Sequence, residues 1–256
     1  MNPISFLGVP IDPLTMEEAI AACVEIVERG ESRTRTLAYV NPHSLVCAHT
    51  DPTVRDALVS SDLRLADGAG LMLVGRLRGT APPARIAAPD FVPRLTEALD
   101  RRGGARYFFY GSSETVLDRI RASVPKSWPV IQIVGTIAPP FRPMTDDEEA
   151  AHVAAINAAC PDVLWVGMTA PKQECWVHRN RHRLRVPLVG SVGAAFDFLA
   201  GTKRRSPLWA RRLGLEWLHR LAMEPARLWE RTLVSAPLFL WYSLLESLGH
   251  GKAGSR

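Results

Sequence analysis

Short apolar runs alternate with stretches of helical periodicity along the first 200 residues. The runs cover residues 5–9, 36–40, 63–68, 107–110, 130–134, 163–166 and 187–189, and turn residues bound most of them, as is typical of strands. Between them lie helical patterns; a Thr15–Glu18 capping box opens the first, and Asp51-Pro52 interrupts the second. Strands that alternate with helices predict an α/β fold with a doubly wound, mostly parallel sheet.

One of these units, residues 162–176, has the form of a binding site. A buried strand leads into a loop with Gly and Pro, and Pro171 then starts a helix whose first turn carries Lys172 and Gln173. Ligands of parallel sheets bind at the carboxyl ends of strands, where helix N-termini offer N–H groups to anions. Lys172 and Gln173 are therefore candidate binding residues, and the alternative is an ordinary turn with a solvated Lys.

Charge divides the chain near residue 200. The protein has 256 residues, 47% of them hydrophobic and 22% charged, so it can bury a sizeable core. Its net charge is +5, and residues 201–256 hold 10 of the 31 Lys and Arg residues but only 4 of the 26 Asp and Glu residues. We predict an α/β domain over residues 1–200 and a basic appendage over residues 201–256 that meets an anionic partner.

The appendage has two contrasting parts. In residues 208–223, Trp or Leu recurs every four residues and arginines lie off that stripe, which favours a helix on an anionic lipid surface. A terminal helix packed on the domain is the alternative. Clustered Arg and Trp also suit single-stranded RNA, but the apolar stripe favours lipid, so no nucleic-acid partner is predicted. Residues 233–248 are apolar but contain Pro237 and Glu246, too interrupted for a good membrane span.

The cysteines and the N-terminus indicate the compartment. The four cysteines show no C-x-x-C spacing, which favours small buried side chains in a reducing environment. The N-terminus lacks a basic segment followed by an unbroken apolar run, so no signal peptide is predicted. We expect a cytoplasmic protein.

Patterns that would indicate metal or dinucleotide chemistry are weak. His178 and His182 have the spacing of a helical zinc pair, but no Glu follows His178 and arginines surround the pair. The sequence Gly68-Ala69-Gly70 lacks the third glycine of a dinucleotide fingerprint. The chain contains no D-x-D, so a metal held on a nucleotide diphosphate is not predicted.

Four polar residues suit the transfer of a sugar from a nucleotide. Asp67, at a predicted strand end, could take the proton of an acceptor hydroxyl, and Arg85 could stabilise a departing diphosphate in place of a metal. Asn41 and Gln173 have the donors and acceptors to orient sugar hydroxyls or an acetamido group. A non-catalytic membrane or nucleic-acid binding protein is the alternative from another class.

The chain resembles the WecG/TagA/CpsF family of bacterial glycosyltransferases from about Phe6 to Leu240. The resemblance rests on motifs in one order: Asn41-Pro42, Leu65-Ala66-Asp67-Gly68-Ala69-Gly70-Leu71, Pro83-Ala84-Arg85-Ile86-Ala87, Pro139-Pro140-Phe141, Ala170-Pro171-Lys172-Gln173-Glu174, residues 192–201 and Gly214-Leu215-Glu216-Trp217. It implies a Rossmann-like fold and inverting transfer, without metal or cofactor, of N-acetylmannosamine or its uronic acid. The donor would be a UDP-sugar and the acceptor a polyprenyl-diphosphate-linked saccharide, in cell-surface polysaccharide or teichoic acid synthesis.

The resemblance also implies roles for single residues. Asp67 becomes the base, Arg85 a leaving-group contact, and Asn41 and Gln173 contacts to the donor sugar. The appendage would dock on the cytoplasmic face of the membrane and close the active site, with two arginines reaching the diphosphate, Arg220 and Arg227. It further implies self-association through surfaces that the appendage otherwise covers.

This sequence departs from the family's pattern near the expected donor site. Tyr39 stands where Thr is common, Ala88 replaces the Gly of Ile-Ala-Gly, and Thr169 replaces the Gly of Gly-Ala-Pro-Lys-Gln. After Trp229, Glu230-Arg231 stands in place of the usual basic pair. N-acetylmannosamine or its uronic acid is favoured as the donor sugar, and glucuronic acid is the alternative.

Overall fold

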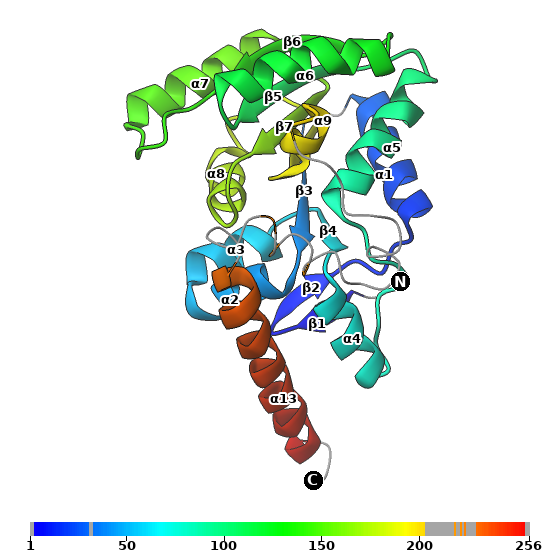
Figure 1. The fold of residues 1–256 in the computed structure, drawn as a ribbon, viewed down its shortest axis with the longest axis vertical. Coiled ribbons are helices and arrows are strands. Elements are labelled where there is room, and N and C mark those ends of the chain that lie inside the picture. Colours follow the sequence, from blue (N-terminus) through cyan, green and yellow to red (C-terminus); the bar gives the residue numbers. More distant parts are fainter. Residues whose placement is uncertain are drawn as a thin grey trace.

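The computed structural model describes residues 3–30, 33–202 and 229–253, together with residues 218, 221 and 223. Within these residues, six parallel strands form the central sheet in the order β4-β3-β8-β7-β5-β6 (Figure 1). The strands are β3 (Arg35–Val40), β4 (Leu63–Ala66), β5 (Arg106–Gly111), β6 (Gln132–Ile137), β7 (Val163–Gly167) and β8 (Leu188–Ser191). The predicted α/β fold with a doubly wound parallel sheet is confirmed, and it is Rossmann-like.

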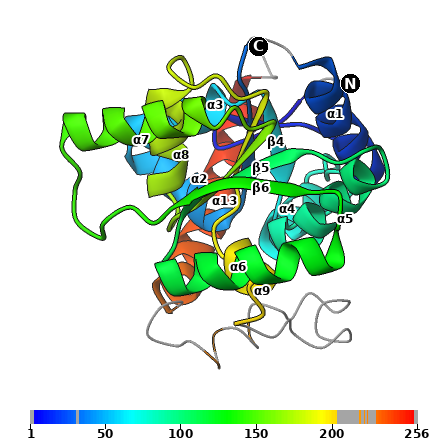
Figure 2. The same ribbon diagram turned by 90° about the horizontal axis from the view of Figure 1, so that it is seen from above.

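Helices cover both faces of this sheet (Figure 2). One face carries α1 (Met16–Arg29), α5 (Ala88–Asp100), α6 (Glu114–Ser127) and α9 (Ala195–Leu199). The other carries α2 (Pro42–Thr50), α3 (Pro52–Val59), α7 (Asp146–Ala158) and α8 (Lys172–Asn180). Successive strand residues alternate between the two cores: Tyr39 and Trp165 enter the first, whereas Val40 and Val166 enter the second. Helices therefore cover both faces of the sheet and exclude solvent from them, as the short apolar runs predicted.

The N-terminal apolar run is a hairpin outside the main sheet, so the prediction of a single strand over residues 5–9 was wrong. β1 (Ile4–Phe6) pairs antiparallel with β2 (Val9–Ile11). Leu7 and Gly8 form the turn with φ of 51° and 75°. Two positive φ angles are what a two-residue hairpin with the right twist requires. Gly8 is the sequence signal for that turn, and the prediction of one strand passed over it.

The structure confirms two other predictions about element ends and moves the start of one predicted strand. Thr15 makes the predicted capping box with Glu18, and Asp51 separates α2 from α3 by accepting a hydrogen bond from the N–H of Thr53 at 2.8 Å. The strand predicted at 130–134 begins instead at Gln132, because the carboxylate of Asp100 accepts a hydrogen bond from the N–H of Val130 at 2.8 Å and holds that residue in a turn.

The described part of the appendage is a helix, α13 (Ser235–Ala253), preceded by a π-helical segment, η1 (Glu230–Val234). It packs against α2, beside which it runs in Figure 1, and it also contacts α4 (Ala69–Leu77). Arg78 forms an ion pair with Glu246 at 2.8 Å, and His43 Nδ1 lies 2.8 Å from Ser235 Oγ. The basic amphipathic helix predicted at 208–223 lies almost entirely outside the described residues. None of the described helices combines the length and the apolar character needed to cross a bilayer.

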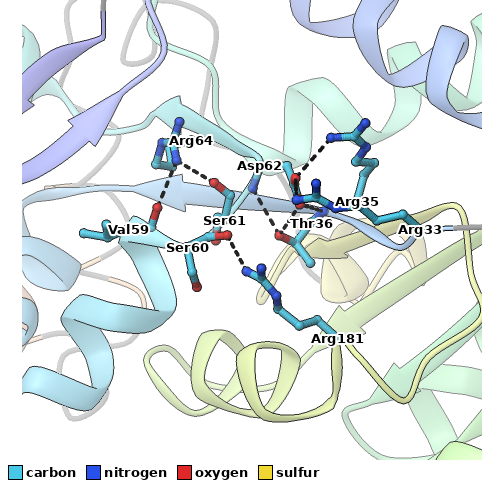
Figure 3. Close-up of polar contacts among 9 residues, drawn as sticks. All are labelled: Arg33, Arg35, Thr36, Val59, Ser60, Ser61, Asp62, Arg64 and Arg181. Atoms are coloured by element: carbon cyan, nitrogen blue, oxygen red, sulfur yellow. Dashed lines mark hydrogen bonds and ion pairs between the residues drawn. The ribbon is translucent and has the colours of Figure 1, made fainter.

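Asp62 ties together the amino ends of β3 and β4 (Figure 3). Its carboxylate accepts hydrogen bonds from the N–H of Thr36 at 3.0 Å and from Thr36 Oγ1 at 3.1 Å. Arg33 and Arg35 also donate to it, at 2.9 and 3.4 Å. The Asp62 side chain is only 12% exposed, whereas that of Arg33 is 62% exposed. The buried hydrogen bonds from Thr36 to Asp62 therefore stabilise the fold more than the exposed ion pair with Arg33 does.

We expect Asp62→Ala to lower the free energy of unfolding by about 1–3 kcal/mol, because it leaves the buried N–H and hydroxyl of Thr36 without their acceptor. Arg33→Ala removes only an exposed ion-pair partner and should cost less than about 1 kcal/mol. Urea unfolding of the two variants measures the difference. Equal midpoints would show that the carboxylate contributes no more than a surface ion pair.

Candidate active site

The carboxyl ends of β3 and β4 bring two of the predicted site residues side by side. These strands are parallel neighbours, with Val40 in register with Ala66, and the next residues along the two strands are Asn41 and Asp67. The N–H of Asp67 donates to the carbonyl of Val40 at 2.8 Å, so the pairing continues one residue past β4. Gly68, the residue after Asp67, has φ of 100° and lies close to Asn41: a Cβ atom added to Gly68 would be 3.7 Å from the Cβ of Asn41. Asp67 and Asn41 are thus fixed by backbone pairing at one edge of the sheet.

Asn41 also has a structural task. Its Oδ1 accepts a hydrogen bond from the N–H of Ser44 at 3.0 Å, and Ser44 Oγ accepts one from the N–H of Asn41 at 2.9 Å. This reciprocal cap starts α2. The carboxamide oxygen of Asn41 is therefore engaged in the cap, and its NH₂ group is the part suited to donate to a ligand.

The loop that carries Arg85 runs along the end of β4. The N–H of Ile86 donates to the carbonyl of Ala66 at 2.7 Å, the residue directly before Asp67. Arg85 is half-buried, and Ile86 next to it is anchored in the core that α1 and α5 share. The structure thus places the guanidinium-bearing residue beside the residue predicted as the base.

Gln173 lies over the end of β8, the strand between β3 and β7. A Cβ atom on Gly193, which follows β8, would lie 3.5 Å from both Nε2 and Oε1 of Gln173. The Gln173 side chain is buried, and its Nε2 donates to Glu174 Oε1 at 2.8 Å. Because a carboxylate only accepts hydrogen bonds, it fixes which end of the amide is the donor. Gln173 Oε1 then finds no hydrogen-bond partner among the residues described, although it is buried.

The remaining predicted contacts differ in how far the structure describes them. Lys172 is the first residue of α8 and is exposed, and Pro171 is the N-cap rather than the first helical residue. Arg220 and Arg227, predicted to reach the diphosphate, lie outside the described residues. Strands in a sheet are about 4.8 Å apart, so the distance from β4 to β8 is roughly 10 Å.

Only one residue of the predicted histidine pair, His178, lies on α8, because that helix ends at Asn180 and His182 falls in the turn after it. His178 Nδ1 lies 2.7 Å from Ser60 Oγ and so joins α8 to α3. In the described part of the chain, no three His, Cys, Asp or Glu side chains gather into a set that could hold a metal ion. The prediction that catalysis is independent of metal is a separate matter and stays a prediction.

Two residues of this edge were not assigned a role from the sequence. Glu174 orients Gln173, and only its position beside Gln173 in the helix could have indicated this. Tyr39 was noted as a departure, yet its burial in the core beneath Asp67 depends on packing between β3, α1 and α5. Burial raises the pKa of Tyr39 well above its usual value, and nearby Cys23 and Asp67 raise that pKa further.

Comparison with known proteins identifies the class of this α/β fold. The model of the "Glycosyl transferase WecG/TagA/CpsF family" matches residues 4–253. A protein of Bacillus spizizenii named N-acetylglucosaminyldiphosphoundecaprenol N-acetyl-beta-D-mannosaminyltransferase is 33% identical over 210 residues, which cover 82% of this chain and 79% of that protein. A Bacillus subtilis protein of the same name is 30% identical over 197 residues, covering 77% and 74% of the two chains.

The protein is therefore a glycosyltransferase with a Rossmann-like fold and a polar site at the carboxyl edge of its sheet. It belongs to the WecG/TagA/CpsF family, as the sequence motifs predicted.

Proposed function

We propose that this protein transfers N-acetylmannosamine, with inversion and without a metal, from a UDP-sugar to a polyprenyl-diphosphate-linked N-acetylglucosamine. The names of both similar Bacillus proteins support this acceptor and this sugar over the uronic acids. The observation that carries the proposal is the convergence of Asn41, Asp67, Arg85 and Gln173 at the adjoining carboxyl ends of β4, β3 and β8.

The proposed reaction is a single displacement. The carboxylate of Asp67 takes the proton of the acceptor hydroxyl while that oxygen forms a bond to the anomeric carbon. The bond from the anomeric carbon to the UDP oxygen breaks, and Arg85 stabilises the negative charge that develops on the diphosphate. Attack from the face opposite the leaving group inverts the anomeric centre.

The donor sugar is held by amide groups in this proposal. Gln173 Oε1 accepts a hydrogen bond from a sugar hydroxyl or from the acetamido N–H, which provides the partner that this buried oxygen does not find among the described residues. Asn41 donates through its NH₂ group. Lys172, exposed at the start of α8, meets the phosphates, as do Arg220 and Arg227 of the appendage.

A donor panel tests this function. Full-length protein is incubated with a short-chain lipid-diphosphate N-acetylglucosamine acceptor, EDTA and one of several UDP-sugars, and UDP release and glycolipid product are followed. We expect turnover with UDP-N-acetylmannosamine. Turnover with UDP-N-acetylmannosaminuronic acid or UDP-glucuronic acid alone would identify another donor, and loss of activity in EDTA that Mg²⁺ restores would overturn metal independence.

We also propose that the protein works at the inner face of the cell membrane and touches it through one apolar surface. α13 and α4 pack together, and both expose large apolar side chains to solvent. We call this the outer apolar surface; its members are Leu73, Leu77, Leu240, Trp241, Leu244, Leu245 and Leu248. Trp and Leu exposed together on neighbouring helices suit the boundary between lipid headgroups and acyl chains, and the basic residues of the appendage suit anionic headgroups.

We expect the double change Trp241→Glu and Leu244→Glu to reduce flotation with phosphatidylglycerol vesicles several-fold, because it removes apolar contact and adds charge that anionic lipid repels. Turnover of a water-soluble short-chain acceptor should persist, since both side chains point to solvent. Phe141→Glu is the matched control, because Phe141 is 90% exposed but lies in the loop between β6 and α7. Equal flotation of the double variant and the control would remove the outer apolar surface from the proposal.

A further inference from the structure

The hydroxyl of Tyr39 is buried, so it needs an acceptor for its hydrogen bond within the protein. Tyr39 is 5% exposed, and its hydroxyl finds no hydrogen-bond partner among the residues that the structure describes. Leaving a buried hydroxyl unpaired is costly, so proteins rarely keep one without a task. Its ring packs edge-on against Phe91 of α5, with ring centroids 6.1 Å apart.

The register of the sheet puts this hydroxyl near Asp67. Tyr39 is paired with Leu65 across β3 and β4, and both side chains enter the core on the α1 and α5 face. Side chains alternate along a strand, and the Asp67 N–H continues the β3 pairing, so Asp67 follows Leu65 on that same face. Burial is the main reason that the pKa of Tyr39 is raised, and the charges of Cys23 and Asp67 raise it further.

Resting on the function proposed above, we propose that Tyr39 is a positioning residue whose hydroxyl donates a hydrogen bond to the Asp67 carboxylate in the substrate-bound enzyme. The bond holds the carboxylate toward the acceptor hydroxyl and stabilises its charged, proton-accepting form. A phenol enclosed in this core keeps its proton over the working pH range, so it acts only as a donor.

Among the described residues, the elements around Asp67 carry other ionisable groups, which include Cys23 on α1, Arg85 in the loop before α5, Asp90 in the first turn of α5 and His43 in the first turn of α2. Burial raises the pKa of Cys23 to about 12, so this thiol stays neutral. None of these four groups is altered by removing the Tyr39 hydroxyl, which makes the pH profile of such a variant a measure of Asp67.

The test is the pH dependence of kcat in Tyr39→Phe, which keeps the ring against Phe91 and removes the oxygen. Without the donated hydrogen bond the pKa of Asp67 rises, and transfer requires the charged form. The acidic limb of the profile should therefore move to higher pH by about one unit, with about tenfold less activity below it and the donor KM unchanged. The Tm of the apo variant should equal or exceed that of wild type, since an unpaired buried hydroxyl is gone.

Tyr107→Phe is the matched control. Tyr107 is equally buried in the same core, but its hydroxyl donates to Thr96 Oγ1 at 3.1 Å. This variant should lose Tm and keep the wild-type pH profile, the reverse of Tyr39→Phe. An unshifted limb in Tyr39→Phe, with Asp67→Asn inactive, would overturn the role of Tyr39 and leave the proposed function standing. Activity retained in Asp67→Asn would instead count against the base itself.

Discussion

Asp67→Asn is expected to lower kcat by about 10²–10⁴-fold, the range that a general base contributes. The amide keeps the size of the carboxylate but cannot take the proton of the acceptor hydroxyl. The backbone bond from the Asp67 N–H to Val40 does not involve the side chain, so the fold at the carboxyl edge should persist. Transfer assays with the short-chain acceptor give kcat, and calorimetric titration with the UDP-sugar gives donor affinity, which should change little.

Asp118→Asn provides the control for this change. Asp118 lies on α6, is 69% exposed and pairs only on the surface with Arg121, so the same chemical change there should leave kcat at the wild-type value. A fully active Asp67→Asn protein would remove Asp67 from the role of base. Loss of donor binding together with kcat would indicate instead that Asp67 holds the sugar.

The sequence predicts the sheet edge of this site well, because parallel strands impose one rule. The residue after each strand must lie at the same edge, so locating the ends of β3 and β4 is enough to bring Asn41 and Asp67 together. A glycine after Asp67 indicates a turn in the sequence. The structure explains that glycine, because Gly68 has φ of 100° and lies close to Pro42, where a side chain would not fit. Local patterns therefore predict this half of the site.

The other half depends on contacts that no local pattern encodes. Gln173 is over 130 residues from Asn41 along the chain, and its position over Gly193 results from the strand order that places β8 between β3 and β7. The orientation of its amide is set by Glu174, and the burial of Tyr39 by α1 and α5. Such features follow from the assembled core. The strand-loop-helix pattern and the motif resemblance both indicated Gln173, but its unpartnered oxygen could be seen only in the structure.

The C-terminal helix illustrates the same limit. The apolar residues 233–248 read from the sequence as a broken hydrophobic run, whereas α13 turns Phe239 inward and leaves Leu240 and Trp241 outside. Phe239 is fully buried, and its ring lies 4.0 Å from the place of a Cβ on Gly70 in the first turn of α4. That turn begins just after Asp67-Gly68. Packing of the appendage therefore supports the segment that carries the proposed base.

Phe239→Ala should for this reason be the most damaging of the core changes considered. Truncating a fully buried Phe costs about 3–5 kcal/mol, because the apolar contact is lost and a cavity remains. For a chain of this size the corresponding fall in Tm is roughly 6–20 °C. Leu240→Ala is the matched control one residue along, and since Leu240 is 46% exposed it should shift Tm far less.

Scanning calorimetry of both variants measures the fall in Tm, and transfer assays well below Tm then report on α4. If α13 supports the site through Phe239, kcat falls in Phe239→Ala while the protein is still folded. If kcat is kept and Tm matches the control, the helix packs on the domain without supporting Asp67.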